Sequence, residues 1–369
     1  MPNQDFLYKI ALTLVKGIGN IRARQVIDNL GDPAILFKEK ARLLELIPGI
    51  SARIVSEIRK PEVLIRAERE LDFIEKNKIQ ALFISDEAYP SRLRECVDAP
   101  VVLYYRGNSS LNAPKIISVV GTRHATAYGK HLVREMIRDF AAYDSEILVV
   151  SGLAYGVDIL AHQAALDEGL STVAVVAHGL DRIYPAEHRN IAVKMLEQGG
   201  LISDFVSETS PERSNFVKRN RIIAGIADCT IVVESASKGG ALITANIADS
   251  YGRDVFAFPG NTKDKYSMGC NLLIKERKAA LVESAEDILR EMRWITEKKA
   301  PIPIQKGLML DVSPEEMMIV DILAKTGSMQ INLLAIELNT PISHLASLLF
   351  GLEMKGLVRC MPGGLYKLL

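Results

Sequence analysis

The feature that most constrains the fold is an alternation of short β-branched runs with amphipathic helical patterns between about residues 80 and 295. A glycine-containing or polar turn follows each run, and in most cases a helical segment comes next. This order is typical of a parallel sheet whose connecting helices cover both faces. We therefore predict an α/β fold with a Rossmann-like, doubly wound, mostly parallel sheet whose strands lie at residues 116–120, 147–150, 172–176, 201–203, 230–233 and 255–258.

The segment before the sheet, residues 1–79, has a helical pattern interrupted by turn signals. The turn Gly17-Ile18-Gly19 and a weaker copy at Pro48-Gly49-Ile50 indicate a helix-hairpin-helix or SAM-like domain. Such glycines let a tight turn present backbone N–H groups to a phosphate. They also occur where helices simply end, and the sequence leaves both interpretations open.

A different pattern follows the predicted sheet domain at residues 80–295. Residues 296–310 have the composition of a linker, and residues 311–369 predict three helices and a hairpin around Pro362-Gly363-Gly364. This arrangement indicates a winged-helix domain. Its candidate recognition helix, residues 343–355, carries only His344, Glu353 and Lys355 as ionisable groups, which favours protein contact or an accessory role over phosphate binding.

Composition limits the classes of partner. The chain has 369 residues, with 45 Lys and Arg against 45 Asp and Glu, so a nucleic-acid site has to come from local clustering of charge. The four cysteines form no CxxC pair, which disfavours a disulfide framework and a structural zinc site and fits a reducing cytoplasm. The sequence contains no apolar run of the ~20 residues that a membrane span needs. We expect a cytoplasmic protein without metal or cofactor.

Ligands of parallel α/β sheets bind outside the carboxyl ends of the strands, where the turns gather. The first predicted strand ends in Gly121-Thr122-Arg123 before a helix, a place suited to an anion. This turn lacks G-x-G-x-x-G, and no acidic residue closes the second strand, which argues against dinucleotide binding. The second strand ends in Ser151-Gly152, small residues that allow close approach of a ligand, and His162 on the next helix is more typical of a structural histidine than of a general base.

A cationic segment follows the fourth strand, and in this segment Arg213, Lys218, Arg219 and Arg221 surround Phe216. Phosphates attract its cations, and an unpaired base can stack on the ring of Phe216, whereas the alternative is a solvated helix start with Phe216 in the core. Together with the turns above and a glycine turn after Glu234, the predicted DNA-binding and phosphate-binding residues are Gly121, Thr122, Arg123, Ser151, Gly152, Arg213, Phe216, Lys218, Arg219, Asn220, Arg221, Lys238 and Gly240.

These segments resemble the DNA-processing protein A family (DprA/Smf). The resemblance covers roughly residues 80 to 285, with a small departure at Asp204, where the family usually has glutamate. The motifs that carry it are Gly121-Thr122-Arg123, Ser151-Gly152-Leu153-Ala154, Ala161-His162, Tyr184-Pro185, Arg219-Asn220-Arg221, Glu234, Gly240-Ala241-Leu242-Ile243-Thr244-Ala245, Pro259-Gly260 and Gly269-Cys270-Asn271-Leu272-Leu273-Ile274.

The resemblance implies a non-enzymatic protein of natural transformation and DNA recombination. Such a protein binds and protects incoming single-stranded DNA, loads a RecA-type recombinase onto it and acts as a homodimer. By the same resemblance, Arg123, Arg213 and Arg219-Asn220-Arg221 would hold phosphates, Phe216 would stack on a base, and Ser151-Gly152 and Gly240 would line the pocket.

Two other functions stay open at this point. Similar sheets serve phosphoribohydrolases, in which a glutamate beside a glycine turn cleaves an N-glycosidic bond, and Glu234 next to Gly239-Gly240 is the candidate here. The turn lacks the proline and the second glutamate that this chemistry uses. The third possibility is a binding module that senses a free mononucleotide.

Overall fold

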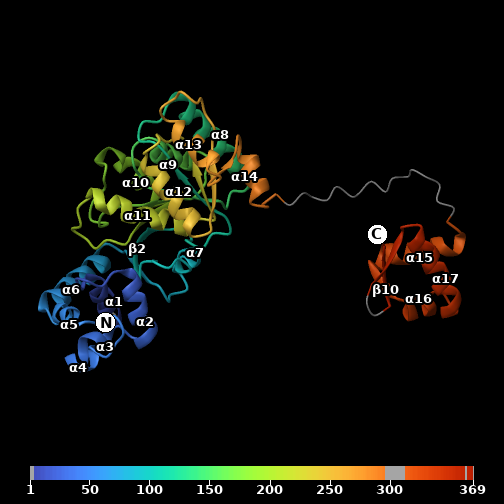
Figure 1. Cartoon of the computed structure of the whole chain (residues 1–369), viewed down its shortest axis with the longest axis horizontal. Coiled ribbons are helices and arrows are strands. Elements are labelled where there is room, and N and C mark those ends of the chain that lie inside the picture. Colours follow the sequence, from blue (N-terminus) through green and yellow to red (C-terminus); the bar gives the residue numbers. More distant parts are fainter. Residues whose placement is uncertain (1–3, 296–311, 362–363, 369) are drawn as a thin grey trace. The chain divides into compact units, whose positions relative to one another are not determined.

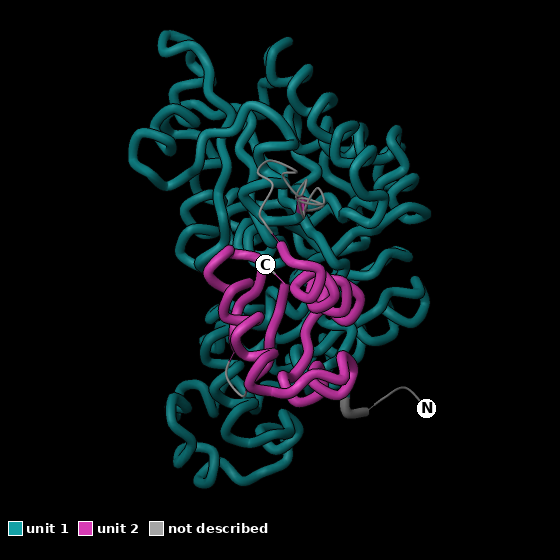
Figure 2. The backbone as a smooth tube through the Cα atoms, turned by 90° about the vertical axis from the view of Figure 1, so that its right-hand side faces the viewer, with its two compact units in different colours: residues 1–294 teal, residues 295–369 magenta. Residues whose placement is uncertain are grey.

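The computed structural model describes residues 4–295, 312–361 and 364–368. The chain forms two compact units, residues 1–294 and residues 295–369, which Figure 2 distinguishes by colour. The predicted linker at residues 296–310 lies outside the described residues. The boundary that we predict between residues 79 and 80 falls inside the first unit and stays a prediction.

Six helices open the first unit and form a group of their own beside the sheet (Figure 1). Gly17 (φ 96°) and Gly49 (φ 87°) occupy the left-handed region before α2 and α5, which favours glycine at both positions. Helix α6 begins with Pro61, whose missing N–H needs no partner in a first turn, and α6 packs against α1. The helices are α1 (Gln4–Leu14), α2 (Asn20–Leu30), α3 (Ala34–Lys38), α4 (Ala41–Leu44), α5 (Ala52–Ile58) and α6 (Pro61–Lys76).

A nine-stranded sheet, in the order β1-β2-β6-β5-β4-β3-β7-β8-β9, forms the centre of this unit. Strands β3 to β9 are parallel, which confirms the predicted mostly parallel sheet, and β1 and β2 add an antiparallel edge next to β6. The strands are β1 (Gln80–Phe83), β2 (Val102–Gly107), β3 (Ile116–Val120), β4 (Leu148–Ser151), β5 (Thr172–Val175), β6 (Gly199–Ser203), β7 (Cys229–Val232), β8 (Asp254–Ala257) and β9 (Ala280–Leu281).

Helices cover both faces of the sheet, because successive side chains of a strand point to opposite faces and those of the central strands are apolar in both directions. In β5, Val173 and Val175 pack into the large core shared with α1–α6, whereas Ala174 packs with Met195 on the other face. Helix α8 packs against α9, and α11 against α12. The helices are α7 (Ser91–Arg94), α8 (Ala127–Tyr143), α9 (Val157–Asp167), α10 (Arg189–Met195), α11 (Arg213–Ile226), α12 (Gly240–Ser250), α13 (Met268–Lys275) and α14 (Ala285–Glu291), with a 3-10 turn η1 (Ala186–His188).

The order in which successive strands are added to the sheet reverses direction at β3. Strands β4, β5 and β6 extend the sheet to one side of β3, and β7, β8 and β9 extend it to the other. The turns that follow β3 and β7 therefore lie side by side at the carboxyl edge. In open parallel sheets this reversal is where ligands bind.

The second unit has a small core of its own around Ile319, Leu345 and Leu349. Ser313 and Glu316 form a capping box at its first helix. Within the described parts of the chain, no single helix is long and apolar enough to cross a membrane. Helices α16 and α17 reach the length and apolar composition of a membrane span only when taken together, and they are bent by 111° at their junction. The elements are α15 (Pro314–Thr326), β10 (Ser328–Gln330), α16 (Ile331–Glu337), α17 (Ile342–Met354), β11 (Val358–Met361) and β12 (Leu365–Leu368), with antiparallel strands in the order β10-β12-β11.

Candidate nucleic-acid interface

The turn between β3 and α8, which carries Arg123, is anchored on two sides. The amide of Thr122 donates to the carbonyl of Glu234 after β7 at 2.7 Å, and the amide of Val157 at the start of α9 donates to the carbonyl of Thr122 at 3.1 Å. Thr126 caps α8 by accepting from the amide of Gly129. Arg123 is exposed, so a fixed backbone presents its guanidinium to solvent.

Phe216 of α11 lies directly opposite this turn. The guanidinium carbon of Arg123 is 5.5 Å from the centre of the Phe216 ring, and the Tyr184 ring meets Phe216 edge to face with centroids 5.9 Å apart. Phe216 is partly exposed, and Arg213, one turn earlier on the same helix, is exposed. A strand laid along this edge therefore meets partly exposed aromatic rings and cations together. We call Arg123, Tyr184, Arg213 and Phe216 the sheet-edge site.

Arg219 lies beneath this site rather than on its surface. Its side chain is 3% exposed, and its Nη1 donates to the carbonyls of Gly152, at 2.6 Å, and Val175. Burial lowers the pKa of Arg219 to about 10, an effect opposed by nearby Asp158, and the guanidinium stays charged at neutral pH. The geometry gives Arg219 the role of tying the ends of β4 and β5 together under Phe216, where sequence analysis had it holding a phosphate.

The small residues after β4 also serve packing. The hydroxyl of Ser151 is buried and donates to the carbonyl of Val119 at 2.6 Å. A Cβ atom at Gly152 would collide with the guanidinium of Arg219, and one at Gly121 would collide with Val157. These residues let the turns and α11 approach one another, so the structure does not place Ser151 and Gly152 where they could line a ligand pocket.

Helix α11 separates the predicted cationic run into two faces. Arg221 is buried, donates to Asp204 at 2.5 Å and contacts the carbonyl of Asp98. Asp204 therefore reaches Arg221 although its side chain is shorter than the glutamate that the family usually has at this position. Lys218 is exposed and faces a groove shared with α2, on the side of α11 that Arg221 occupies.

The other predicted residues are spread over the Arg123 turn, α11 and α12. Lys238 and Gly240 are exposed at the start of α12, after β7, and Asn220 is half-buried in α11. Thr122 is half-buried, and its hydroxyl accepts from the amide of His124 at 3.2 Å. Of the predicted set, Arg123, Arg213 and Phe216 are the side chains that this edge presents together.

Glu234, the candidate catalytic acid, is 3% exposed. One carboxylate oxygen accepts from the amide of Thr126 at 2.9 Å, and the other accepts from the Thr126 hydroxyl at 2.6 Å. Both oxygens thus bind the start of α8, where the helix dipole stabilises a negative charge. Glu234 therefore links the end of β7 to the Arg123 turn.

His162 and His178 are buried histidines below the same edge. The Nδ1 of His162 lies 2.7 Å from the hydroxyl of Thr172, and burial, with Arg219 close by, lowers the pKa of His162 to about 3. Burial also lowers the pKa of His178, whose Nε2 accepts from the amide of Tyr184. His162 is therefore neutral at physiological pH and fully covered, which fits the structural interpretation.

Sequence reasoning missed two parts of this edge. Tyr184 was noted in a motif but not as a site residue, because its contact with Phe216 joins turns far apart in the chain. The rings of His124 and Tyr266 stack with centroids 6.1 Å apart, and Lys265 lies over Tyr266 at 5.3 Å. The two lysines before the aromatic ring in Lys263-Asp264-Lys265-Tyr266 were the signal that could have indicated it.

Comparison with known proteins identifies the family. A family model described as DNA recombination-mediator protein A matches residues 80–293. The chain belongs to this family. Members similar to this chain include the DNA processing protein DprA of Streptococcus pneumoniae, 38% identical over 68% of this chain and 88% of that protein, and the protein Smf of Escherichia coli, 32% identical over 82% of this chain and 80% of that protein.

Solved structures of DNA recombination-mediator proteins agree with this assignment. The X-ray structure of DprA from Streptococcus pneumoniae is 34% identical, with a TM-score of 0.58 over 74% of this chain and 98% of that one. DprA from Helicobacter pylori, whose structure is described as giving insight into a single-stranded DNA binding mode, is 25% identical, with a TM-score of 0.53 over 59% of this chain and 96% of that one. The region matched by the family model contains the whole sheet-edge site.

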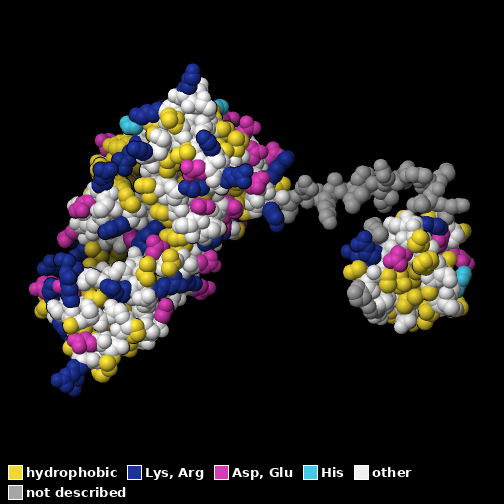
Figure 3. Space-filling model, in the orientation of Figure 1, with side chains coloured by type: hydrophobic (Ala, Val, Ile, Leu, Met, Phe, Trp, Pro, Cys, Tyr) yellow, Lys and Arg dark blue, Asp and Glu magenta, His cyan; other side chains and the backbone are white. Residues whose placement is uncertain are grey.

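Among the described residues, no three His, Cys, Asp or Glu side chains are grouped so that they could hold a metal ion. The cations of the first unit are also not confined to one stripe. Figure 3 shows Lys and Arg side chains interspersed with Asp and Glu over its visible face. Contact with a polyanion therefore depends on local geometry.

Proposed function

We propose that this member of the DNA recombination-mediator protein A family binds single-stranded DNA at the sheet-edge site. The observation that carries the proposal is the position of the Arg123 guanidinium over the partly exposed ring of Phe216, 5.5 Å from its centre. A ring gives an unpaired base a stacking surface, and the adjacent cations give its phosphates a partner. A duplex, whose bases are already stacked, gains little from the ring.

The biological role that we propose is the protection of incoming single-stranded DNA and the loading of a RecA-type recombinase onto it during natural transformation and DNA recombination, in the cytoplasm. The family description, DNA recombination-mediator protein A, supports this role. A chain with equal numbers of basic and acidic residues and a local cationic edge suits a protein that hands its DNA to a partner, because binding through a few phosphates is readily exchanged.

We further propose three domains joined in a homodimer: a helix-hairpin-helix or SAM-like domain at residues 1–79, the Rossmann-like domain at residues 80–295 and a winged-helix domain at residues 311–369. The paired glycine turns support the first assignment. Three helices with a three-stranded antiparallel sheet support the last. The exposed Phe350 and Met354 on α17 favour protein contact over DNA binding by this helix.

We propose that the chain acts as a binding protein rather than an enzyme. The engagement of both Glu234 oxygens with Thr126 supports this, since a general acid or nucleophile needs access to its substrate. A single-turnover assay with nucleoside monophosphates tests it. Release of a free base by the wild-type protein, and its loss in Glu234→Gln, would establish the phosphoribohydrolase alternative.

The test of DNA binding is fluorescence anisotropy of a labelled oligo-dT and its duplex counterpart across a salt series. Arg123→Ala is expected to weaken single-strand binding and to reduce the salt slope by about 0.7, the contribution of one phosphate contact. Lys194→Ala, which removes an exposed cation from the last turn of α10, is the matched control and should leave both unchanged. If wild type fails to bind oligo-dT at low salt, the proposal is wrong.

A further inference from the structure

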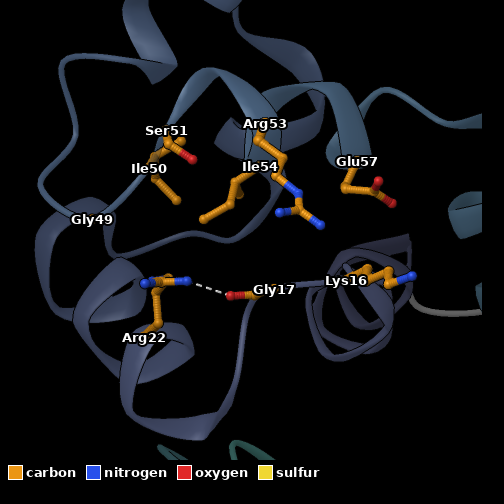
Figure 4. Close-up of a pocket in the computed structure, with 9 residues that line it drawn as sticks. All are labelled: Lys16, Gly17, Arg22, Gly49, Ile50, Ser51, Arg53, Ile54 and Glu57. Atoms are coloured by element: carbon orange, nitrogen blue, oxygen red, sulfur yellow. Dashed lines mark hydrogen bonds between the residues drawn. The ribbon is translucent and has the colours of Figure 1, made fainter.

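A second cationic pocket lies among the N-terminal helices, well separated in sequence from the family match. It is formed where the turn before α2 faces the turn before α5 (Figure 4). Arg53 extends from α5 into the space between the two turns, and Lys16 and Glu57 lie at one end of it. We call this the hairpin pocket; its lining residues are Lys16, Gly17, Arg22, Gly49, Ile50, Ser51, Arg53, Ile54 and Glu57.

The two turns are packed reciprocally. A Cβ atom at Gly17 would lie 3.7 Å from Ile54 of α5, and one at Gly49 would lie 3.8 Å from the Nε of Arg22 of α2. Arg22 also donates to the carbonyl of Gly17 and so links both turns. The turn at Gly17 thus packs against α5, and the turn at Gly49 packs against α2. This holds two similar backbone segments in a fixed relation around one cavity.

The residues that line the hairpin pocket carry a net positive charge. Lys16, Arg22 and Arg53 line it against a single carboxylate, Glu57, which Lys60 binds at 2.8 Å. Lys16 and Arg53 are exposed, so their charges face solvent rather than a buried partner. Three cations gathered around a cavity of this kind attract an anion with more than one negative group.

None of the nine lining residues, all of them in the described part of the chain, is aromatic. A ligand here is held by charge and by hydrogen bonds alone, without the ring that a nucleobase needs for stacking. Backbone phosphates meet that requirement. They are also what a duplex exposes, because its bases are covered by pairing and stacking.

The cations continue beyond the hairpin pocket. Arg22 also lines an adjoining groove between α2 and α11, together with Gly19, Gln25 and Lys218. Lys218 is exposed on the face of α11 turned away from Phe216. The row Lys16, Arg53, Arg22, Lys218 therefore forms a track for successive phosphates, separate from the sheet-edge site.

We infer that the hairpin pocket and its continuation to Lys218 bind the phosphate backbone of duplex DNA. This goes beyond the proposed single-strand function and does not depend on it. The same chain then contacts duplex through exposed cations on one side of α11 and single strand through aromatic and cationic groups on the other. Contacts of this kind are independent of sequence, because phosphates carry no base information.

The experiment compares a labelled blunt duplex with an oligo-dT of equal length in the full-length protein. In the double variant Lys16→Ala/Arg53→Ala, duplex affinity should fall about tenfold at low salt and the duplex salt slope should fall by about 2, since each lost phosphate contact removes about 0.9. Oligo-dT affinity should stay at the wild-type value. Both substituted residues are exposed, so the fold is retained, as the unfolding midpoint checks.

The matched control is Lys40→Ala/Arg69→Ala, which removes the same two kinds of exposed cation from the N-terminal segment outside the pocket. It should leave duplex binding unchanged. Glu57→Gln, which removes the one carboxylate of the lining, should strengthen duplex binding about threefold. Unchanged duplex affinity in Lys16→Ala/Arg53→Ala, an equal loss in Lys40→Ala/Arg69→Ala, or weaker duplex binding in Glu57→Gln overturns the inference.

The outcomes separate this inference from the single-strand proposal. Wild-type binding to oligo-dT but not to duplex overturns the hairpin pocket as a duplex site and leaves the sheet-edge site standing. Binding to duplex that is lost in Lys16→Ala/Arg53→Ala, with oligo-dT affinity unchanged by the same substitutions, supports the hairpin pocket even if Arg123→Ala has no effect on oligo-dT binding. Equal losses for both DNA forms would mean one shared site and would overturn the division proposed here.

Discussion

The sheet-edge site and the hairpin pocket are both built from turns that precede helices, yet they use their cations differently. At the sheet edge, Arg219 is buried, binds carbonyls and lies 5.9 Å from the centre of the Phe216 ring, and Arg123 lies 5.5 Å from the centre of the same ring. In the hairpin pocket, Lys16 and Arg53 are exposed and no ring lines the cavity in the described structure. The comparison teaches that the number of basic residues in a turn says little. Burial decides whether a cation supports the fold or a ligand, and a neighbouring ring decides which form of DNA it suits.

The largest expected difference concerns stability. Arg219→Ala leaves the carbonyls of Gly152 and Val175 without their buried donor, so the free energy of unfolding should fall by about 3 kcal/mol. Arg53→Ala, the exposed counterpart in the hairpin pocket, should leave it unchanged. Urea denaturation of both variants measures this. An unchanged midpoint in Arg219→Ala would contradict the supporting role.

The next effect separates stacking from charge. Phe216→Leu keeps an apolar side chain but removes the ring, and we expect oligo-dT binding to weaken by about 2 kcal/mol without a change in salt slope. Duplex binding should not change. Anisotropy titrations measure both, and Phe37→Leu, which removes a ring stacked on Tyr8 in the N-terminal helices, is the control. A parallel loss of duplex affinity would remove the distinction between the two sites.

Acid should weaken the sheet domain rather than the N-terminal helices, because the two histidines whose pKa burial lowers, His162 and His178, both follow residue 120. The pKa of His162 is about 3 in the folded chain, against a usual value of about 6.5, so the unfolded chain binds the proton first. Its stabilising contribution is complete above pH ~6.5 and is lost as the pH falls toward 3. At pH 5.5 the loss is about 1 kcal/mol.

Chemical denaturation at pH 7.5 and pH 5.5 tests this contribution. In His162→Gln the difference between the two pH values should shrink, because glutamine can still meet the hydroxyl of Thr172 but does not titrate. It should not vanish, since burial also lowers the pKa of His178. An undiminished difference would mean that His162 is not the residue responsible.

The smallest effect should come from Tyr266, whose ring stacks on His124 on the far side of the Arg123 turn. We expect Tyr266→Ala to weaken oligo-dT binding by no more than about 1 kcal/mol, and only for strands long enough to cross that turn. A length series of oligo-dT measures it. Equal losses at every length would show that Tyr266 acts on Phe216 or Arg123 instead of on the strand.

Much of the fold follows from local pattern. The runs at 116–120 and 172–176 predicted strands because β-branched residues bounded by turns suit a sheet buried on both faces, and β3 and β5 lie there. The short edge strand β9 and the antiparallel pair β1 and β2 were not predicted. Strand β9 has two residues and β1 has four, which is too short for a clear periodicity, and β2 pairs with β6 about a hundred residues further along the chain.

The candidate site was predictable to the level of the turn, not of the side chain. Arg219, Asn220 and Arg221 are adjacent in sequence, but a helix points neighbours about 100° apart, so Arg219 enters the sheet edge and Arg221 turns to Asp204. No spacing rule distinguishes a buried guanidinium from an exposed one. The contact between Tyr184 and Phe216 likewise depends on how the loop after β5 meets helix α11.

The anchoring of the Arg123 turn bears on kinetics. Glu234 and Val157 hold the backbone of Thr122 from both sides, and Thr126 is bound to the carboxylate of Glu234. A strand that docks on this turn therefore orders little of the protein, and little conformational entropy is lost on association. Release needs no unfolding step either. Exchange of the strand can then proceed as fast as its contacts break, which suits the proposed transfer of single-stranded DNA to a recombinase.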